Sequence, residues 1–144
     1  MFSGCLRVLT LSLFTAAFAF SPLHAQTAAY VSNSDGGSVS VIDTASNTVT
    51  ANIPVGQLPA GIAFSPDGAT AYVADFADGA VTPVGLAAGT PRTPIKVPLG
   101  PRAIAITPDG KTAYVASWLV VPSLRSLPTA PPGMVTPICL PSSK

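Results

Sequence analysis

The sequence of 144 residues contains no Glu, one His and only two Cys, and charged residues make up 9% of it. His24 and Cys5 both precede residue 26, so the rest of the chain has no His and a single thiol, Cys139. Without His or Glu, that part lacks the usual general bases and zinc ligands. One Cys excludes an internal disulfide and leaves a free thiol or an intermolecular link, of which we favour the free thiol.

Charge is also sparse and balanced. From residue 26 onward the sequence holds three Lys, three Arg and six Asp, so this part is formally neutral at pH 7. A neutral chain has no electrostatic reason to bind nucleic acid or an anionic membrane surface. We therefore expect neither as a partner.

The N-terminal segment has the features of an export signal. Arg7 provides a short positive region, and Val8–Phe20 is an apolar run too short to span a bilayer comfortably. A Ser-Pro pair interrupts the run, and the small residue Ala25 follows. We predict a helical signal peptide over residues 1–25, cleavage after Ala25, and a periplasmic or secreted chain with no stable membrane anchor. The alternatives are a buried helix and an uncleaved anchor.

One stretch of the sequence occurs twice. Pro59–Ala74 returns 42 residues later as Pro101–Ala116. Ala29–Ser32 lies 42 residues before the second half of Pro59–Ala74 and matches it. Each full copy contains two short apolar segments joined by a Pro-Asp-Gly turn, with Pro and Gly where a type I turn prefers them. The repeat therefore predicts a recurring β-hairpin.

Further alternating segments lie between the hairpins. Ser38–Ile42 and Thr48–Ile53 follow the partial copy Ala29–Ser32, and Ala80–Val84 and the weaker Arg92–Val97 follow the full copy Pro59–Ala74. A complete unit thus holds four short strands, and four-stranded units of about 40–45 residues are typical of β-propeller blades. We predict an all-β fold of antiparallel, propeller-type blades over residues 26–117.

The end of the chain has a different character. Residues 118–144 contain six Pro and no Asp, and at the offset of the repeat no turn or alternating strand follows Trp118. We expect residues 118–144 to be an irregular, Pro-rich tail.

Several blocks resemble the YVTN-type β-propeller repeats, in the order and at the spacing of that family. They are Ala29–Asn33, Val39–Val49, Ile53–Gly56 and Ile62–Gly68. The resemblance covers roughly residues 28–116 and implies a secreted or periplasmic propeller, mostly used as a binding or interaction module. A related group of propellers comprises lactonases and metal-dependent hydrolases, whose active-site residues find no counterpart here.

The strands are too few for a closed ring, because known propellers use about four to eight blades. We expect an open arrangement of two to three blades, and three explanations stay open. The chain is a truncated or frameshifted product of a longer gene, it completes a ring with other chains, or it is a small open stack. Truncation is favoured because the tail shows no sign of packing. Uncovered edges and apolar faces favour aggregation or partner binding.

The six Asp are the only acids. Asp67 and Asp109 lie in equivalent Pro-Asp-Gly turns, and Asp43 follows a strand, so we expect all three to cap turns. Asp75 and Asp78 are close enough in sequence to share a cation. However, they lack the further acids of an EF-hand loop, so a calcium site is disfavoured.

Two other groups of side chains recur or cluster. Three cations that lie close together in the sequence suggest a small anion site, although solvated loop charges are the favoured interpretation: Arg92, Lys96 and Arg102. Three tyrosines occupy one position of the repeat and are predicted to pack between blades: Tyr30, Tyr72 and Tyr114.

We therefore expect no catalytic, cofactor-binding or metal-binding residue. The leading hypothesis is an exported propeller repeat protein that acts as a binding or interaction module, with a protein partner or further blades at its open faces. The alternative is a fragment of a propeller hydrolase or lactonase whose catalytic residues lie on blades outside this chain. A third interpretation is a non-functional remnant.

Overall fold

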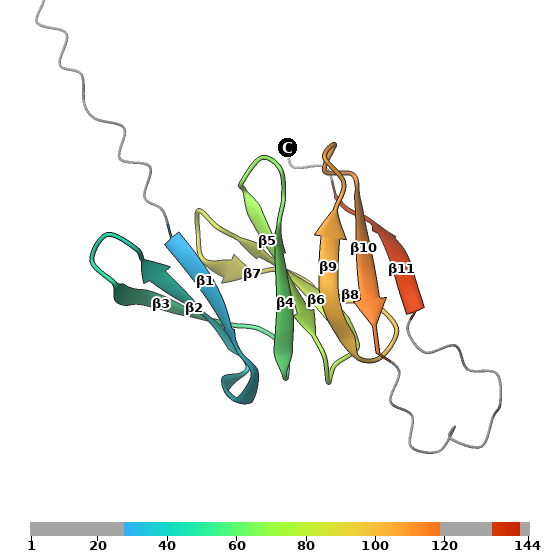
Figure 1. Ribbon diagram of the computed structural model, residues 1–144, viewed down its shortest axis with the longest axis horizontal. Helices are drawn as coiled ribbons and strands as arrows, with labels where there is room; N and C mark the ends of the chain where they lie inside the picture. The colour runs from blue at the N-terminus through green and yellow to red at the C-terminus, as the bar shows by residue number, and fades with distance from the viewer. Residues whose placement is uncertain (1–27, 119–133, 142–144) are drawn as a thin grey trace, which may run out of the picture.

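The computed structural model describes residues 28–118 and 134–141, and these residues form three β-sheets that stand side by side in chain order (Figure 1). The first sheet contains β1 (Ala28–Asn33), β2 (Ser38–Asp43) and β3 (Thr48–Pro54), with a short 3-10 turn, η1 (Ser34–Gly36), between β1 and β2. The second contains β4 (Pro59–Phe64), β5 (Thr70–Asp75), β6 (Ala80–Gly85), β7 (Thr90–Pro91) and β8 (Ile95–Lys96). The third contains β9 (Pro101–Ile106), β10 (Thr112–Ser117) and β11 (Met134–Cys139).

Every paired strand is antiparallel, and each sheet follows the order of the chain. The predicted fold class is confirmed: the described chain is all-β and its sheets form an open stack rather than a closed ring. The predicted hairpins appear as β4–β5 and β9–β10, each turning through its Pro-Asp-Gly segment. The predicted signal peptide, residues 1–25, lies outside the described residues.

The outer strand of the second sheet is divided into two short pieces because its neighbour, β6, contains a proline. Strand β7 pairs with β6 at Val84 and Gly85, and β8 pairs with it at Ala80 and Val81. Between these pairings lies Pro83, which has no N–H to donate to a strand on that side. One long outer strand over the predicted Arg92–Val97 is therefore replaced by two-residue pairings.

The tail contains a strand that the sequence pattern did not predict. Strand β11 pairs with β10 along its whole length, with Val115 opposite Thr136. This register matches the pairing of β5 with β6, in which Val73 lies opposite Thr82. The expectation of an irregular tail over 118–144 is therefore wrong for Met134–Cys139, which occupies the place of a third blade strand.

The reason for the error is a longer connection. Four residues separate β5 from β6, whereas sixteen separate β10 from β11. A search at the constant offset of the repeat therefore looks for the strand too early. The strand itself repeats its counterpart, since Val135-Thr136-Pro137 reproduces the Val-Thr-Pro of β6. Truncation was favoured because the tail showed no sign of packing. Since β11 packs on β10, that reason no longer holds.

The core lies between the sheets. One cluster joins the first sheet to the second and has Val39, Ile53, Ala71, Val73 and Val84 as its buried members. The other joins the second sheet to the third and is formed by Tyr72, Val81, Ala113, Val115, Ile138 and Leu140. Because alternate residues of a strand point to opposite faces, β5 contributes to both clusters and is buried along its full length. Among the described residues, the middle sheet is thus covered on both faces and each end sheet on one.

Candidate functional site

The acidic residues of the turns bind their own backbone. Asp67 Oδ1 accepts hydrogen bonds from the Ser65 hydroxyl at 2.5 Å and from the Ala69 N–H at 3.0 Å. Asp109 makes the equivalent bonds in the third sheet, which hold the pKa of its carboxyl below the ordinary value. Asp43 accepts a hydrogen bond from the Ala45 N–H. The predicted turn-capping role is confirmed for all three Asp.

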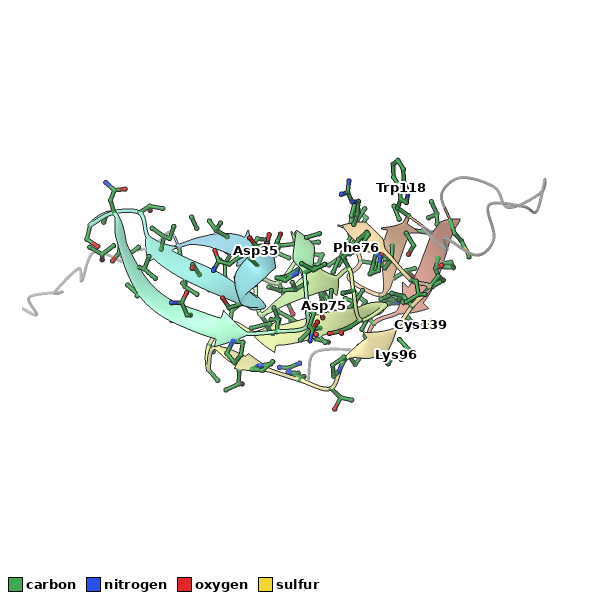
Figure 2. The ribbon with its side chains drawn as sticks, turned by 90° about the horizontal axis from the view of Figure 1, so that it is seen from below. Asp35, Asp75, Phe76, Lys96, Trp118 and Cys139 are labelled. Carbon is green, nitrogen blue, oxygen red and sulfur yellow. The ribbon has the colours of Figure 1, made fainter. Side chains whose placement is uncertain are left out.

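Asp75 and Asp78 hold a connection between sheets. The buried Asp75 accepts hydrogen bonds from the Thr82 hydroxyl at 2.5 Å and from the Gly56 N–H at 3.1 Å. Asp78 Oδ2 accepts the Gln57 N–H at 2.8 Å. Both carboxylates therefore fix the segment that runs from β3 to β4. Figure 2 shows Asp75 close to the middle of the molecule.

Burial is the largest influence on Asp75 and raises the pKa of its carboxyl, and Asp78 adds to the effect. The hydrogen bonds from Thr82 and Gly56 oppose it. Gly56 is essential to this arrangement, because a Cβ at that position would lie 2.5 Å from the Asp75 carboxyl carbon. Within residues 28–118 and 134–141, no group of three or more His, Cys, Asp or Glu side chains is placed to hold a metal ion.

The position of Asp75 is polar in all three sheets. In the first sheet it is Asn33, which donates from Nδ2 to the Ser40 hydroxyl at 2.8 Å. In the third sheet it is Ser117, whose hydroxyl is buried without a partner, as is that of Thr136. Pro98 takes the position of Gly56 in the repeat and has no N–H to give, so Ser117 lacks the backbone donor that binds Asp75 in the second sheet.

The three predicted cations do not form one anion site. The guanidinium of Arg92 lies beside Gly85, at the end of β6. Lys96 donates to the backbone oxygen of Asp78, ahead of the start of β6, at 3.4 Å. Arg102 lies over two rings, with its guanidinium carbon 5.6 Å from the centre of Phe76 and 5.9 Å from that of Trp118. Lys96 and Trp118 are on opposite sides of the molecule in Figure 2.

One cleft opens between the second and third sheets, at the end that carries the Pro-Asp-Gly turns. It has a volume of about 650 Å³, and its polar lining includes Asp67, Tyr72, Arg92, Asp109 and Lys111. Burial raises the pKa of Tyr72, Arg92 opposes the shift and Asp67 adds to it. The two carboxylates are already engaged by their turns, so the cleft has mixed charge and no obvious ligand class.

Among the described residues, no sheet packs on the outer face of the third sheet. This surface, here called the Tyr114 face, has only small or apolar strand residues: Ala103, Ala105, Thr112, Tyr114, Ala116, Val135, Pro137 and Cys139. Tyr72, the counterpart of Tyr114, is 4% exposed, whereas Tyr114 is 47% exposed. Val81 is 0% exposed, whereas its counterpart Val135 is 63% exposed. Packing between sheets is thus confirmed for Tyr30 and Tyr72 but wrong for Tyr114, because no described sheet covers it.

The part of the chain that the structure describes leaves the outer face of the first sheet uncovered as well. This Val31 face combines the apolar residues Ala29, Val31, Ile42 and Val49 with the hydrogen-bonded polar residues Asn33, Ser40 and Asn52. Val31 is 44% exposed, while its counterparts Val73 and Val115 are 1% and 0% exposed. A register shift between β2 and β3 places Val49 opposite Ile42 and leaves it on this face. The repeat explains both faces, since each one matches a surface that is buried elsewhere in the stack.

Sequence reasoning missed the part of the Tyr114 face that β11 contributes. Val135 and Pro137 belong to the unpredicted strand β11, so the face looked like a narrow two-strand surface. The signal that reveals them is the repeated Val-Thr-Pro, found by comparing segments without a fixed offset. Among the described residues, no helix has the length and apolar character needed to cross a bilayer.

Known proteins support the architecture. No family model matches the chain, and a comparison with curated proteins finds no match. Hydrazine synthase from Kuenenia stuttgartiensis matches with a TM-score of 0.62 and 37% identity, over 63% of this chain and 26% of that one. The sheets are β-propeller-like blades.

Two further structures agree. The dihydro-heme d1 dehydrogenase NirN, solved in complex with DHE, has a TM-score of 0.58 and 27% identity, over 66% of this chain and 20% of its own. A functionally unknown protein from Desulfotomaculum acetoxidans has a TM-score of 0.59 and 21% identity, over 65% of this chain and 32% of its own. The chain thus spans about a third or less of the length of each of these proteins.

Proposed function

We propose that this chain is an exported, non-catalytic binding module of YVTN-type propeller blades that engages a protein partner through its Tyr114 face. The observation that carries the proposal is the contrast between equivalent residues, since Tyr72 and Val81 are buried by a neighbouring blade and Tyr114 and Val135 are not. An apolar surface that the same fold covers one repeat earlier is a natural contact surface.

The distribution of chemistry supports a binding role over catalysis. Five of the six described Asp serve turns or the β3–β4 connection, and the sequence from residue 26 onward contains no His or Glu. Tyr, by contrast, is a residue that contributes much of the energy of protein interfaces. Export is supported by the signal-like pattern of residues 1–25.

A second candidate follows from the comparisons. Hydrazine synthase and the NirN dehydrogenase are named as enzymes. In this candidate, the described blades are the propeller portion of an enzyme, and the catalytic residues lie outside this chain. A hydrolase or a lactonase is the class of enzyme that the sequence resemblance suggests. The contact surface is the same in both candidates, so the partner found on it separates them.

A photo-cross-linking residue placed at position 114 tests the role of the face in the native cells of the protein. We expect an adduct from position 114 and none from the same probe at Ala87, an exposed residue in the turn between β6 and β7. An adduct with a catalytic subunit favours the enzyme candidate. Absence of any adduct from position 114 would refute a binding role for the Tyr114 face.

A further inference from the structure

The two uncovered faces of this stack are complementary halves of an interface that the molecule already contains twice. The Tyr side of the first blade packs against the Val side of the second in one core cluster. The Tyr side of the second blade packs against the Val side of the third in the other. What remains free is a Tyr side on the third blade and a Val side on the first.

We propose that the Tyr114 face of one chain packs on the Val31 face of a second copy, so that two chains form a ring of six blades. This inference rests on the proposed binding role of the Tyr114 face and names its occupant. The contact is head to tail, because two different faces meet, and such contacts close into rings when the rotation permits.

The number of blades argues for two copies. Each chain supplies three sheets, so two chains supply six, within the range of about four to eight blades that known propellers use. Three chains would supply nine, outside that range. The ring leaves no end blade uncovered, which removes both exposed faces at once.

The second and third blades differ at one position that limits which backbone can pack on the Tyr114 face. A Cβ at Gly61 would clash with the backbone oxygen of Arg102, because the inner strands β4 and β9 approach closely there. The third blade has Ala103 at the corresponding position. In the described residues the first blade begins with β1, the counterpart of β5, and has no inner strand. The first blade of a second copy therefore brings no described backbone against the Ala103 methyl group.

Charge does not oppose the pairing. The chain from residue 26 onward is formally neutral, and neither face contains a charged side chain. Attraction between copies then depends on apolar burial, as it does between blades within the chain.

Size-exclusion chromatography with light scattering on the full chain tests the proposal. We expect the wild type to elute with twice the mass of one chain. Val31→Asp and Tyr114→Asp place a charge on an exposed position of each face, and each variant alone should have the mass of one chain. Ala87→Asp, which adds the same charge away from both faces, should keep the double mass. Circular dichroism checks that each variant retains its strands.

Mixing the two single-face variants is the sharper test. The Val31→Asp chain keeps its Tyr114 face and the Tyr114→Asp chain keeps its Val31 face, so the mixture should form a one-to-one pair at high concentration. A mixture that stays at the mass of one chain would overturn the head-to-tail contact. A Val31→Asp variant that pairs with itself would indicate a symmetric contact and overturn it too.

Other outcomes separate this inference from the proposed function. A wild type with the mass of one chain at every concentration, or with more than two chains, overturns the ring of two. If the probe at position 114 then cross-links to a different protein, the binding role stands while the second copy is excluded as occupant. If that probe forms no adduct, both are refuted.

Discussion

Replacing Asp75 by Ala should destabilise the chain strongly, because two donors lose their acceptor at once. The Thr82 hydroxyl and the Gly56 N–H both bind this buried carboxylate. Each buried donor left without a partner costs about 1–3 kcal/mol, so Asp75→Ala should lower the free energy of unfolding by about 2–6 kcal/mol. Urea unfolding followed by circular dichroism measures this difference as a change of midpoint at constant slope.

Asp75→Asn is the matched control, because the first blade already uses Asn at this position. Asn33 donates to Ser40, the counterpart of Thr82. At position 75 the Asn side chain can donate to the Thr82 hydroxyl and accept the Gly56 N–H. The loss should therefore stay below about 1 kcal/mol, the net contribution of a single typical hydrogen bond.

The pH dependence gives a second readout of the same site. Burial raises the pKa of Asp75 above 3.8, so the folded chain holds this proton to a higher pH than the unfolded chain does. The contribution of the group is fully present below 3.8 and is lost as the pH rises through the folded pKa. Asp75→Asn should remove that part of the pH dependence. Equal losses for the Ala and Asn variants, or a loss near zero for Ala, would refute the reasoning.

Three other substitutions, and a fourth that serves as a control, probe separate parts of the stack. Gly61→Ala should lower the free energy of unfolding by more than about 2 kcal/mol in urea titrations, because its Cβ would meet the Arg102 backbone oxygen. Asp109→Asn should weaken the loss of stability on acidification below 3.8, since the lowered pKa of Asp109 makes its contribution present above that value and lost below it. Ile138→Ala should cost about 2–4 kcal/mol in thermal or urea unfolding, because Ile138 belongs to the core between the second and third blades. Cys139→Ser, at an exposed position of the same strand, should change stability by less than about 0.5 kcal/mol.

Much of the fold could be predicted from the sequence because the repeat is local and regular. A strand, a Pro-Asp-Gly turn and a returning strand need only short-range information, and Asp67 and Asp109 cap those turns as their positions indicate. The position of β11 depends on a longer connection from β10, which a fixed period cannot accommodate. Proline usually interrupts a strand, yet Pro83 lies within β6, which has paired strands on both sides. This is possible because the outer partner consists of two short strands, β7 and β8, that pair with β6 on either side of Pro83.

The candidate site was harder to predict, because exposure depends on what lies next to a blade. Tyr72 and Tyr114 have the same sequence surroundings, and only the presence of a further sheet decides which one is buried. The role of Asp75 likewise depends on Gly56, which is far away in the sequence and close in space. Pairings of this kind become visible only when the sheets are stacked.

The central claim is that the third blade continues through β11 and so presents a complete Tyr114 face. Thr112 lies directly opposite Cys139 in the register of β10 and β11, and paired residues of antiparallel strands are close enough for a disulfide. In a Cys5→Ser background, Thr112→Cys should form an intramolecular disulfide with Cys139 on mild oxidation, detected as the loss of two hydrogen masses. Thr70→Cys, at the equivalent position of the second blade, should not. Failure of Thr112→Cys to form this bond in the folded chain would contradict the account.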